Sequence, residues 1–166
     1  MLLVIGGVSG SGKSRVGKRI AELIGGVFFD GDDFHPAANK EKMSRREPLT
    51  DADRGPWLAK MAELLHDRRN LTESTVLACS ALKSTYREIL RVDPRVRIAI
   101  LDLPKETLMA RLAGRKGHFF PPDLLESQLR TLEAPADEPG TEMIHGDRPV
   151  DELARAVIAW ASEGSV

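Results

Sequence analysis

The sequence predicts a three-layer α/β fold in which helices flank a five-stranded parallel sheet. Short apolar runs suited to buried strands alternate along the chain with longer segments of helical periodicity. Polar or acidic clusters follow several of these runs, as expected where the carboxyl ends of parallel strands meet. No repeat, linker or low-complexity segment interrupts the pattern. We therefore expect one domain over residues 1–166, with right-handed crossovers.

The composition restricts the compartment and the partners expected for this domain. Charged residues make up 30% of the chain and the formal net charge is −1, which argues against nucleic acid as the main partner. Cys79 is the one cysteine, so no internal disulfide can form and a reducing compartment is expected. The start of the chain lacks the pattern of a signal peptide, and no apolar run reaches membrane length. We expect a cytoplasmic protein with no membrane partner.

The first strand is expected over Leu2–Ile5, and the strongest motif of the chain follows it. Residues 7–14 read GVSGSGKS, which fits G-x-x-x-x-G-K-[ST], the phosphate-binding P-loop. Glycines let the backbone N–H groups of such a loop turn inward around an anion. The apolar side chains behind the loop recur at helical spacing, at Val16, Ile20, Leu23 and Ile24. The loop should therefore lie at a helix N-terminus, which favours phosphate.

Each residue type in the loop suits a nucleotide. The residues expected to hold its phosphates are Gly10, Ser11, Gly12, Lys13 and Ser14. The ammonium group of Lys13 would reach the β- and γ-phosphates. The hydroxyl of Ser14 would hold Mg²⁺, a hard cation that prefers oxygen ligands.

The second strand is expected over Val27–Phe29, and an acidic cluster follows it. Its carboxylates are Asp30, Asp32 and Asp33. They would lie at the edge where open α/β sheets bind ligands. Asp30 and Asp32 have equal parity in an extended chain, so both can address one site. A polar turn capped by an aspartate is the structural alternative, and Asp33 could replace either residue.

Residues 34–56 are expected to form an insert between a strand and a helix. Its segment 37–46 should be helical in part, and Pro48 interrupts it. Thr50 and Asp53 fit a capping box with Asp in place of Glu. A core-facing helix should follow from Trp57 onward, with Leu58, Met61, Leu64 and Leu65.

The insert could cover a small anionic substrate. The side chains available for this are His35, Asn39, Lys40, Lys42, Arg45, Arg46 and Arg54. Most surface charges of this kind are merely solvated. Arg54 is the exception that we favour, because it is set between Asp53 and a Gly-Pro pair.

The third strand is expected over Thr75–Cys79, and Lys83 follows it at the same edge of the sheet. Tyr86 and Leu90 are among the residues that mark the next helix. Cys79 should be a small buried apolar residue, since no histidine is placed to suggest a nucleophile.

The fourth strand, Val96–Leu101, leads into a helix. Its core-facing side chains are Leu108 and Leu112. Arg111 and Arg115 are i, i+4 neighbours on one face of this helix. Residues 114–122 combine Lys116, glycine and a double proline, which suits a lid that closes over phosphates. An ordinary helix–helix loop is the alternative.

The last elements are a helix, a short strand and a helix. The helix from Asp123 should leave Gln128 facing the cleft. Its core side chains should be Leu124, Leu125, Leu129 and Leu132. A weakly marked strand is expected over Met143–His145, and the final helix over Val150–Trp160.

The combined motifs resemble those of the thermoresistant-type gluconokinases. Besides GVSGSGKS, the matching stretches are DGDDFHP (30–36), NKEKM (39–43), EPLTDADRGPW (47–57), CSALK (79–83) and RKGHFFPP (115–122). They cover nearly the whole chain in the right order. Together they are specific to far fewer protein families than a P-loop alone. Residues 44–47, SRRE, depart from the pattern by being more basic, which should alter only the rim of the site.

The resemblance implies a reaction, a fold and an assembly. The family phosphorylates D-gluconate at O6 with MgATP and gives 6-phosphogluconate. Its fold is similar to those of shikimate kinase and the nucleoside monophosphate kinases, and its members are often dimers. We therefore expect ATP and Mg²⁺ as cofactors, gluconate as substrate and a homodimer.

Within that reaction we assign roles to the phosphate loop and the acidic cluster. Lys13 follows the γ-phosphate. Ser14 ligates Mg²⁺, and Asp30 holds one of its waters. Asp32 accepts the proton of the attacking hydroxyl, and this choice within the acidic cluster is the most open assignment.

The remaining roles concern gluconate and adenine. Arg54 would pair the gluconate carboxylate with a bidentate fork. His35, Lys83 and Gln128 would hydrogen-bond the polyol. Arg115 and Lys116 would arrive with the lid. By resemblance to the shikimate kinases, Arg111 is expected to stack on adenine with Pro149 on the other face.

Three alternatives stay open from the residues alone. The first is a kinase for another small acid or polyol, such as shikimate. The second is a nucleotide-switch GTPase, but residues 39–42 read NKEK where guanine recognition needs N-K-x-D. The third is a nucleotide-binding scaffold without activity, in which Asp30 and Asp32 would be idle.

Overall fold

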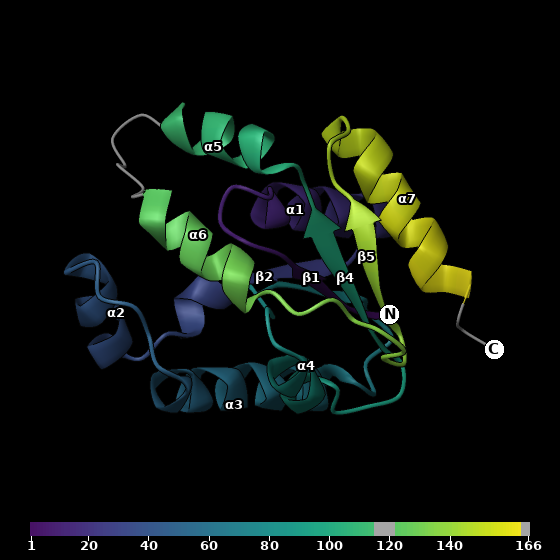
Figure 1. Ribbon diagram of the computed structural model, residues 1–166. Coiled ribbons are helices and arrows are strands. Elements are labelled where there is room, and N and C mark those ends of the chain that lie inside the picture. Colours follow the sequence, from purple (N-terminus) through teal and green to yellow (C-terminus); the bar gives the residue numbers. More distant parts are fainter. Residues whose placement is uncertain (115–121, 164–166) are drawn as a thin grey trace.

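The computed structural model describes residues 1–114 and 122–163, and it confirms the three-layer α/β fold (Figure 1). All strand pairings of the sheet are parallel, and the strand order is β2-β3-β1-β4-β5. The strands are β1 (Leu2–Gly6), β2 (Val27–Asp30), β3 (Thr75–Ala78), β4 (Val96–Asp102) and β5 (Thr141–His145). The strand that precedes the P-loop is therefore central.

Helices cover both faces of the sheet. They are α1 (Lys13–Ile24), α2 (Ala37–Ser44), α3 (Asp51–Arg68), α4 (Ser84–Leu90), α5 (Lys105–Ala113), α6 (Pro122–Thr131) and α7 (Val150–Glu163). A short 3₁₀ helix, η1 (Gly31–Phe34), follows β2 directly. In Figure 1, α1 and α7 lie on one side of the sheet, and α3 and α4 lie on the other.

The core consists of two apolar clusters separated by the sheet. Leu3 and Ile5 of β1 pack in the cluster that contains α1 and α7. Leu2 and Val4 pack in the opposite cluster, which contains α3 and α4. A strand buried on both faces needs apolar side chains at every position, which explains its uninterrupted apolar run.

The strand ends bring three parts of the site to one edge of the sheet. Asp30 at the end of β2 pairs in register with Ala78 of β3. The backbone amide of Gly7 donates a 3.0 Å hydrogen bond to the carbonyl oxygen of Ser80, just beyond β3. The P-loop, the acidic cluster and the loop after β3 therefore lie side by side.

A buried arginine fixes the loop after β3. Arg87 of α4 is fully buried and donates 2.9 Å hydrogen bonds to the carbonyl oxygens of Ala81 and Leu82. Its charge is balanced by Glu138, 2.6 Å away. Pairing is essential for a charge this deep in the protein.

Helix α3 and strand β5 begin earlier in the chain than predicted. Helix α3 begins at Asp51, not beyond Pro56, because Thr50 and Asp53 form the complete capping box at its start. The helix continues through Pro56, which has no N–H to donate to the turn before it. Strand β5 begins at Thr141, earlier than expected, since pairing with β4 extends it over two polar residues.

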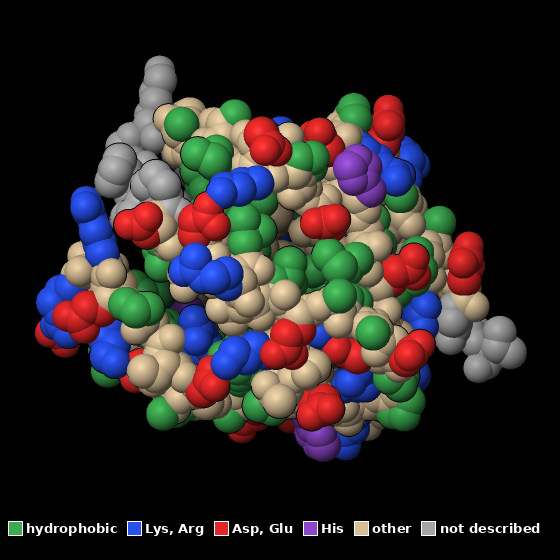
Figure 2. Space-filling view, viewed as in Figure 1, with side chains coloured by type: hydrophobic (Ala, Val, Ile, Leu, Met, Phe, Trp, Pro, Cys, Tyr) green, Lys and Arg blue, Asp and Glu red, His purple; other side chains and the backbone are tan. Residues whose placement is uncertain are grey.

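The surface carries both signs of charge. On the face in Figure 2, Lys and Arg side chains alternate with Asp and Glu side chains and do not gather in a patch of one sign. Among the described helices, none combines the length and hydropathy that a membrane span requires.

Candidate functional site

The P-loop adopts a backbone conformation that could hold phosphate, and we call it the phosphate cradle. Gly7, Gly10 and Gly12 have φ values of 132°, 84° and 91°, in the region that favours glycine. Gly12 is the left-handed N-cap of α1, so the loop ends at the positive end of the helix dipole. The ammonium of Lys13 lies over the loop and donates a 3.0 Å hydrogen bond to the carbonyl oxygen of Val8.

Two oxygen-bearing side chains that could hold a magnesium ion, Ser14 and Asp30, meet beside this cradle. The hydroxyl of Ser14 donates a 2.8 Å hydrogen bond to Oδ2 of Asp30. The other carboxylate oxygen of Asp30 accepts from the amide of Asp32 at 3.1 Å, which orients the carboxylate. In the described part of the chain, no three acidic, histidine or cysteine side chains group into a metal site. The pair suits Mg²⁺, which keeps waters and binds substrate phosphates alongside few protein ligands.

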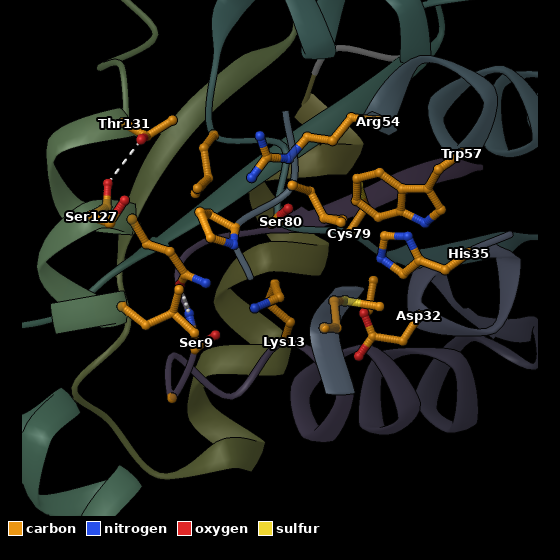
Figure 3. A pocket seen from close by; sticks show the side chains of 18 of the residues that line it. Ser9, Lys13, Asp32, His35, Arg54, Trp57, Cys79, Ser80, Ser127 and Thr131 are labelled. Atoms are coloured by element: carbon orange, nitrogen blue, oxygen red, sulfur yellow. Dashed lines mark hydrogen bonds between the residues drawn. The ribbon is translucent and has the colours of Figure 1, made fainter. Parts of the chain in front are cut away.

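A cavity of about 500 Å³ opens in front of the P-loop (Figure 3). It lies among the loop, η1, the connection from α2 to α3, and α6. The predicted site residues that line it are Gly10, Gly12, Lys13, Ser14, Asp30, Asp32, His35, Arg54 and Gln128. Positions spread over nearly 120 residues of chain therefore converge on one space.

Asp32 stands out within the acidic cluster. Burial raises the pKa of its carboxyl group, the charge of Asp30 raises it further, and Lys13 opposes both effects. A carboxylate with a raised pKa is a better proton acceptor. Asp33 lines a different hollow, beside Lys18 and Phe28. The geometry therefore favours Asp32 over Asp33 at the cavity.

His35 lies against the aromatic wall of the cavity. Its ring stacks on Trp57 with centroids 4.3 Å apart and planes inclined by 11°. The indole N–H donates a 2.7 Å hydrogen bond to the carbonyl oxygen of Gly31, which fixes the stack. Burial lowers the pKa of His35 to about 4, helped by the nearby charges of Lys40 and Arg54. His35 is therefore neutral near pH 7.

Arg54 and Lys83, which are both predicted to contact the substrate, lie in different surroundings. Arg54 lines the cavity and donates a 3.3 Å hydrogen bond from Nη1 to the hydroxyl of Tyr86. Lys83 is not among the residues that line the cavity. Its ammonium group is held by both carboxylate oxygens of Asp51, at 2.9 and 3.0 Å, and Asp51 also accepts from Tyr86. Lys83 is thus bound to the first turn of α3. No motif in the sequence indicates the contacts that Asp51 makes with Lys83 and Tyr86.

Gln128 joins α6 to the P-loop. Its Oε1 accepts a 2.7 Å hydrogen bond from the backbone amide of Ser9, across 119 residues of sequence. Because that oxygen is engaged, the side chain offers its NH₂ group to the cavity.

A second cavity of about 500 Å³ lies on the other side of the P-loop. The predicted adenine contacts Arg111 and Pro149 both line it, together with Gly10, Ser11 and Gly12. Arg111 also lies 3.7 Å from a carboxylate oxygen of Asp147. The structure thus brings the expected adenine contacts to one space beside the phosphate cradle.

Arg115, Lys116 and most of the lid expected over residues 114–122 lie outside the described residues. Cys79 is buried, and burial raises the pKa of its thiol to about 12. The thiol is therefore protonated near pH 7, as expected for a residue that is not a nucleophile.

Comparisons with known proteins agree with this arrangement. A family model described as the AAA domain matches residues 2–139. A gluconokinase of Gluconobacter oxydans (strain 621H) is 44% identical over 157 residues, which cover 94% of this chain and 88% of that protein. The crystal structure of a gluconokinase from Sinorhizobium meliloti 1021 superposes with a TM-score of 0.88 at 43% identity, covering 98% of this chain and 91% of that chain. A shikimate kinase from Bacteroides thetaiotaomicron shares the fold alone, with a TM-score of 0.67 at 15% identity and 98% of each chain covered.

Proposed function

Because the chain belongs to the gluconokinase family, we propose that it transfers the γ-phosphoryl group of ATP to O6 of D-gluconate. The observation that carries the proposal is the composition of the cavity in front of the P-loop. It combines a carboxylate of raised pKa, Asp32, with the guanidinium group of Arg54. The first suits a hydroxyl that must lose a proton, and the second suits a carboxylate that must be held.

The phosphate loop supplies most of the charge stabilisation in this mechanism. Backbone amides from Gly10 to Ser14 and the ammonium of Lys13 would hold the β- and γ-phosphates. Ser14 and Asp30 would hold Mg²⁺, which neutralises phosphate charge when bound. Adenine would lie in the second cavity, between Arg111 and Pro149.

The acceptor half of the cavity performs the remaining work. O6 of gluconate bonds to the γ-phosphorus as the bond from that phosphorus to the β–γ bridging oxygen breaks. The proton of the hydroxyl passes to a carboxylate oxygen of Asp32, and ADP leaves with the bridging oxygen. Arg54 holds the gluconate carboxylate, while His35 and Gln128 hydrogen-bond the hydroxyl groups between the two ends.

A coupled assay of ADP release tests the reaction. We expect gluconate to give a higher kcat/KM than shikimate, other sugar acids and nucleoside monophosphates. Asp32→Asn should lower kcat by about 10²-fold or more, the usual contribution of a positioned base. Asp33→Asn is the matched control and should retain activity, since Asp33 lines another hollow. Preference for another acceptor would overturn the proposed substrate, and an active Asp32→Asn variant would overturn the base.

The proposal includes a cytoplasmic enzyme that works as a homodimer. The single buried cysteine supports a reducing compartment. The family resemblance supports the dimer, and sedimentation of the purified protein would measure its mass in solution.

A further inference from the structure

An asparagine outside the reacting centre contacts the ring of His35. Asn39 of α2 is only 4% exposed, and its Nδ2 lies 3.3 Å from Nδ1 of His35. The same Nδ2 donates a 2.9 Å hydrogen bond to the backbone carbonyl oxygen of Asp53, at the start of α3. One amide nitrogen thus faces both the imidazole ring and a carbonyl group.

The carbonyl group determines which way the amide points. A backbone carbonyl oxygen only accepts hydrogen bonds, so Asn39 must present its NH₂ group to Asp53. The reverse orientation would set the amide oxygen of Asn39 against the carbonyl oxygen and lose the hydrogen bond. The second hydrogen of the same NH₂ group then points at Nδ1 of His35.

The amide in turn determines the protonation of the imidazole ring. A nitrogen that faces an N–H donor must offer its lone pair, so Nδ1 of His35 carries no proton. A neutral imidazole without a proton on Nδ1 carries it on Nε2. His35 lines the cavity that we assign to the acceptor substrate, and its exposed fraction is 8%.

We propose that Asn39, anchored by the carbonyl oxygen of Asp53, is a positioning residue that fixes His35 as a neutral hydrogen-bond donor through Nε2. The Nε2–H group of the ring then donates a hydrogen bond to a substrate oxygen. The ring does not accept a hydroxyl proton. The identity of the substrate in this assignment rests on the proposed function. The tautomer of His35 does not depend on that function.

The charged groups around His35 agree with a neutral ring. Lys40 of α2 and Arg54 of α3 are the cations that act on it, and both disfavour an imidazolium. One face of the ring is covered by Trp57. Asp32 of η1 and Glu47, between α2 and α3, line the same cavity, but the contact at Nδ1 is the Asn39 amide.

The assignment separates the hydrogen-bond donors of the cavity from its proton acceptor. His35, Gln128 and Arg54 all present donors, whereas Asp32 presents an acceptor. A polyhydroxy acid offers lone pairs along its whole length and one hydroxyl proton that must be removed. The hydroxyl that donates to Asp32 would therefore be selected as the nucleophile, because its neighbours face donors.

The tautomer can be measured without substrate by NMR of ¹⁵N-histidine-labelled protein. The chain has four histidines, and His35→Gln identifies the signals of His35 by their loss. We expect the Nε2–H pattern with no titration between pH 5.5 and 8 in the unsubstituted protein. An Nδ1–H pattern, or titration near pH 6.5, would overturn the assignment, whether or not the protein phosphorylates gluconate.

Asn39→Ala tests the cause. Without the amide, the His35 signals should report mixed tautomers, and the ring should titrate closer to its usual range. Lys42→Ala is the matched control, because Lys42 bonds the side chain of Asp53 and not its carbonyl. This control should keep the Nε2–H pattern. An unchanged tautomer in folded Asn39→Ala would contradict the role of Asn39.

Kinetics give a second readout that a purely structural role would not produce. At pH 8, Asn39→Ala should raise the KM for gluconate about 3- to 10-fold, the effect of one weakened hydrogen bond, with the KM for ATP unchanged. At pH 5.5 the difference should shrink, because an imidazolium donates from Nε2 whatever its neighbour. A pH-independent loss would count against the proposal. If Asn39→Ala fails to fold, the NMR spectrum of the unsubstituted protein still decides the tautomer.

Discussion

The backbone amide of Ser9 and Oε1 of Gln128 lie 2.7 Å apart, and this hydrogen bond holds the P-loop to α6. Both groups belong to the wall of the acceptor cavity (Figure 3). The contact joins a residue near the start of the chain to one in its last third. The loop is therefore supported by a segment that the motif itself does not contain.

Removing this acceptor should destabilise the protein. Gln128→Leu leaves the Ser9 amide without its partner, which should lower the free energy of unfolding by about 1–3 kcal/mol. Urea denaturation measures the change. Gln128→Glu is the control, because it keeps an oxygen for Ser9 and should restore most of the stability. Its negative charge should still raise the KM for gluconate, so an unaltered KM in Gln128→Glu would place Gln128 away from the substrate.

Lys13→Ala should leave a folded protein whose kcat is lower by orders of magnitude. An ammonium group beside the transferred phosphoryl group stabilises charge that develops in the transition state. Steady-state kinetics and circular dichroism together separate activity from folding. Lys18→Ala provides the control, since Lys18 lies over the ring of Phe28 in another hollow. Near-normal turnover in Lys13→Ala would contradict the P-loop mechanism.

Arg54→Leu should chiefly raise the KM for gluconate. A lost charge-assisted hydrogen bond is worth about 1.5–3 kcal/mol, or roughly 10- to 150-fold, and the KM for ATP should barely change. Lys83→Ala tests the contrasting position, because Lys83 pairs with Asp51 outside the cavity lining. Its effect on the KM for gluconate should be far smaller. Equal increases in the KM for gluconate in the two variants would show that Lys83 also contacts the substrate.

The stability of the protein should fall as His35 is titrated in the unfolded chain. The pKa of His35 is lowered to about 4 in the folded protein from 6.5. The unfolded state therefore binds more protons below pH 6.5, and the free energy of unfolding should decrease from there down to about pH 4. Between pH 7.5 and 5 this group should account for a loss of about 2 kcal/mol.

Urea titrations at several pH values measure this loss. His35→Gln is the comparison, because it lacks the titrating ring. The difference in unfolding free energy between the two proteins should vary with pH in the window from 6.5 to 4. A difference that stays constant there would show that His35 titrates alike in the folded and unfolded states.

Short-range patterns carried the parts of the site that the sequence could predict. The P-loop motif fixed the cradle, and buried strands fixed the edge to which Asp30 and Asp32 belong. Chemical type and family resemblance predict His35 and Arg54 as site residues, and both line the cavity. Such features depend on neighbours within a few residues or on the general geometry of parallel sheets.

Other features of the structure are not predicted by the sequence, and contacts between distant segments are the main example. The sequence predicts that Lys83 contacts the substrate, and the structure places its ammonium group on Asp51, 32 residues away. The Gly-Pro pair at 55–56 favours a boundary there, whereas the helix begins at the predicted capping box of Thr50 and Asp53. Leu124 looked like a core residue, yet it lines the cavity. In each case a tertiary contact or a cap outweighs a local preference.

In the proposed mechanism, the groups assigned to proton transfer and to gluconate, Asp32, His35 and Arg54, lie between η1 and the start of α3, whereas most groups assigned to the phosphates lie in the loop after β1. Apart from Gln128 of α6, recognition of the acceptor and binding of the phosphates would therefore occupy separate stretches of chain. Substitutions, insertions or deletions between η1 and α3 should therefore leave the phosphate cradle in place. This partition offers a route by which descendants of one ancestral scaffold could acquire different acceptors while their use of nucleotide stayed the same.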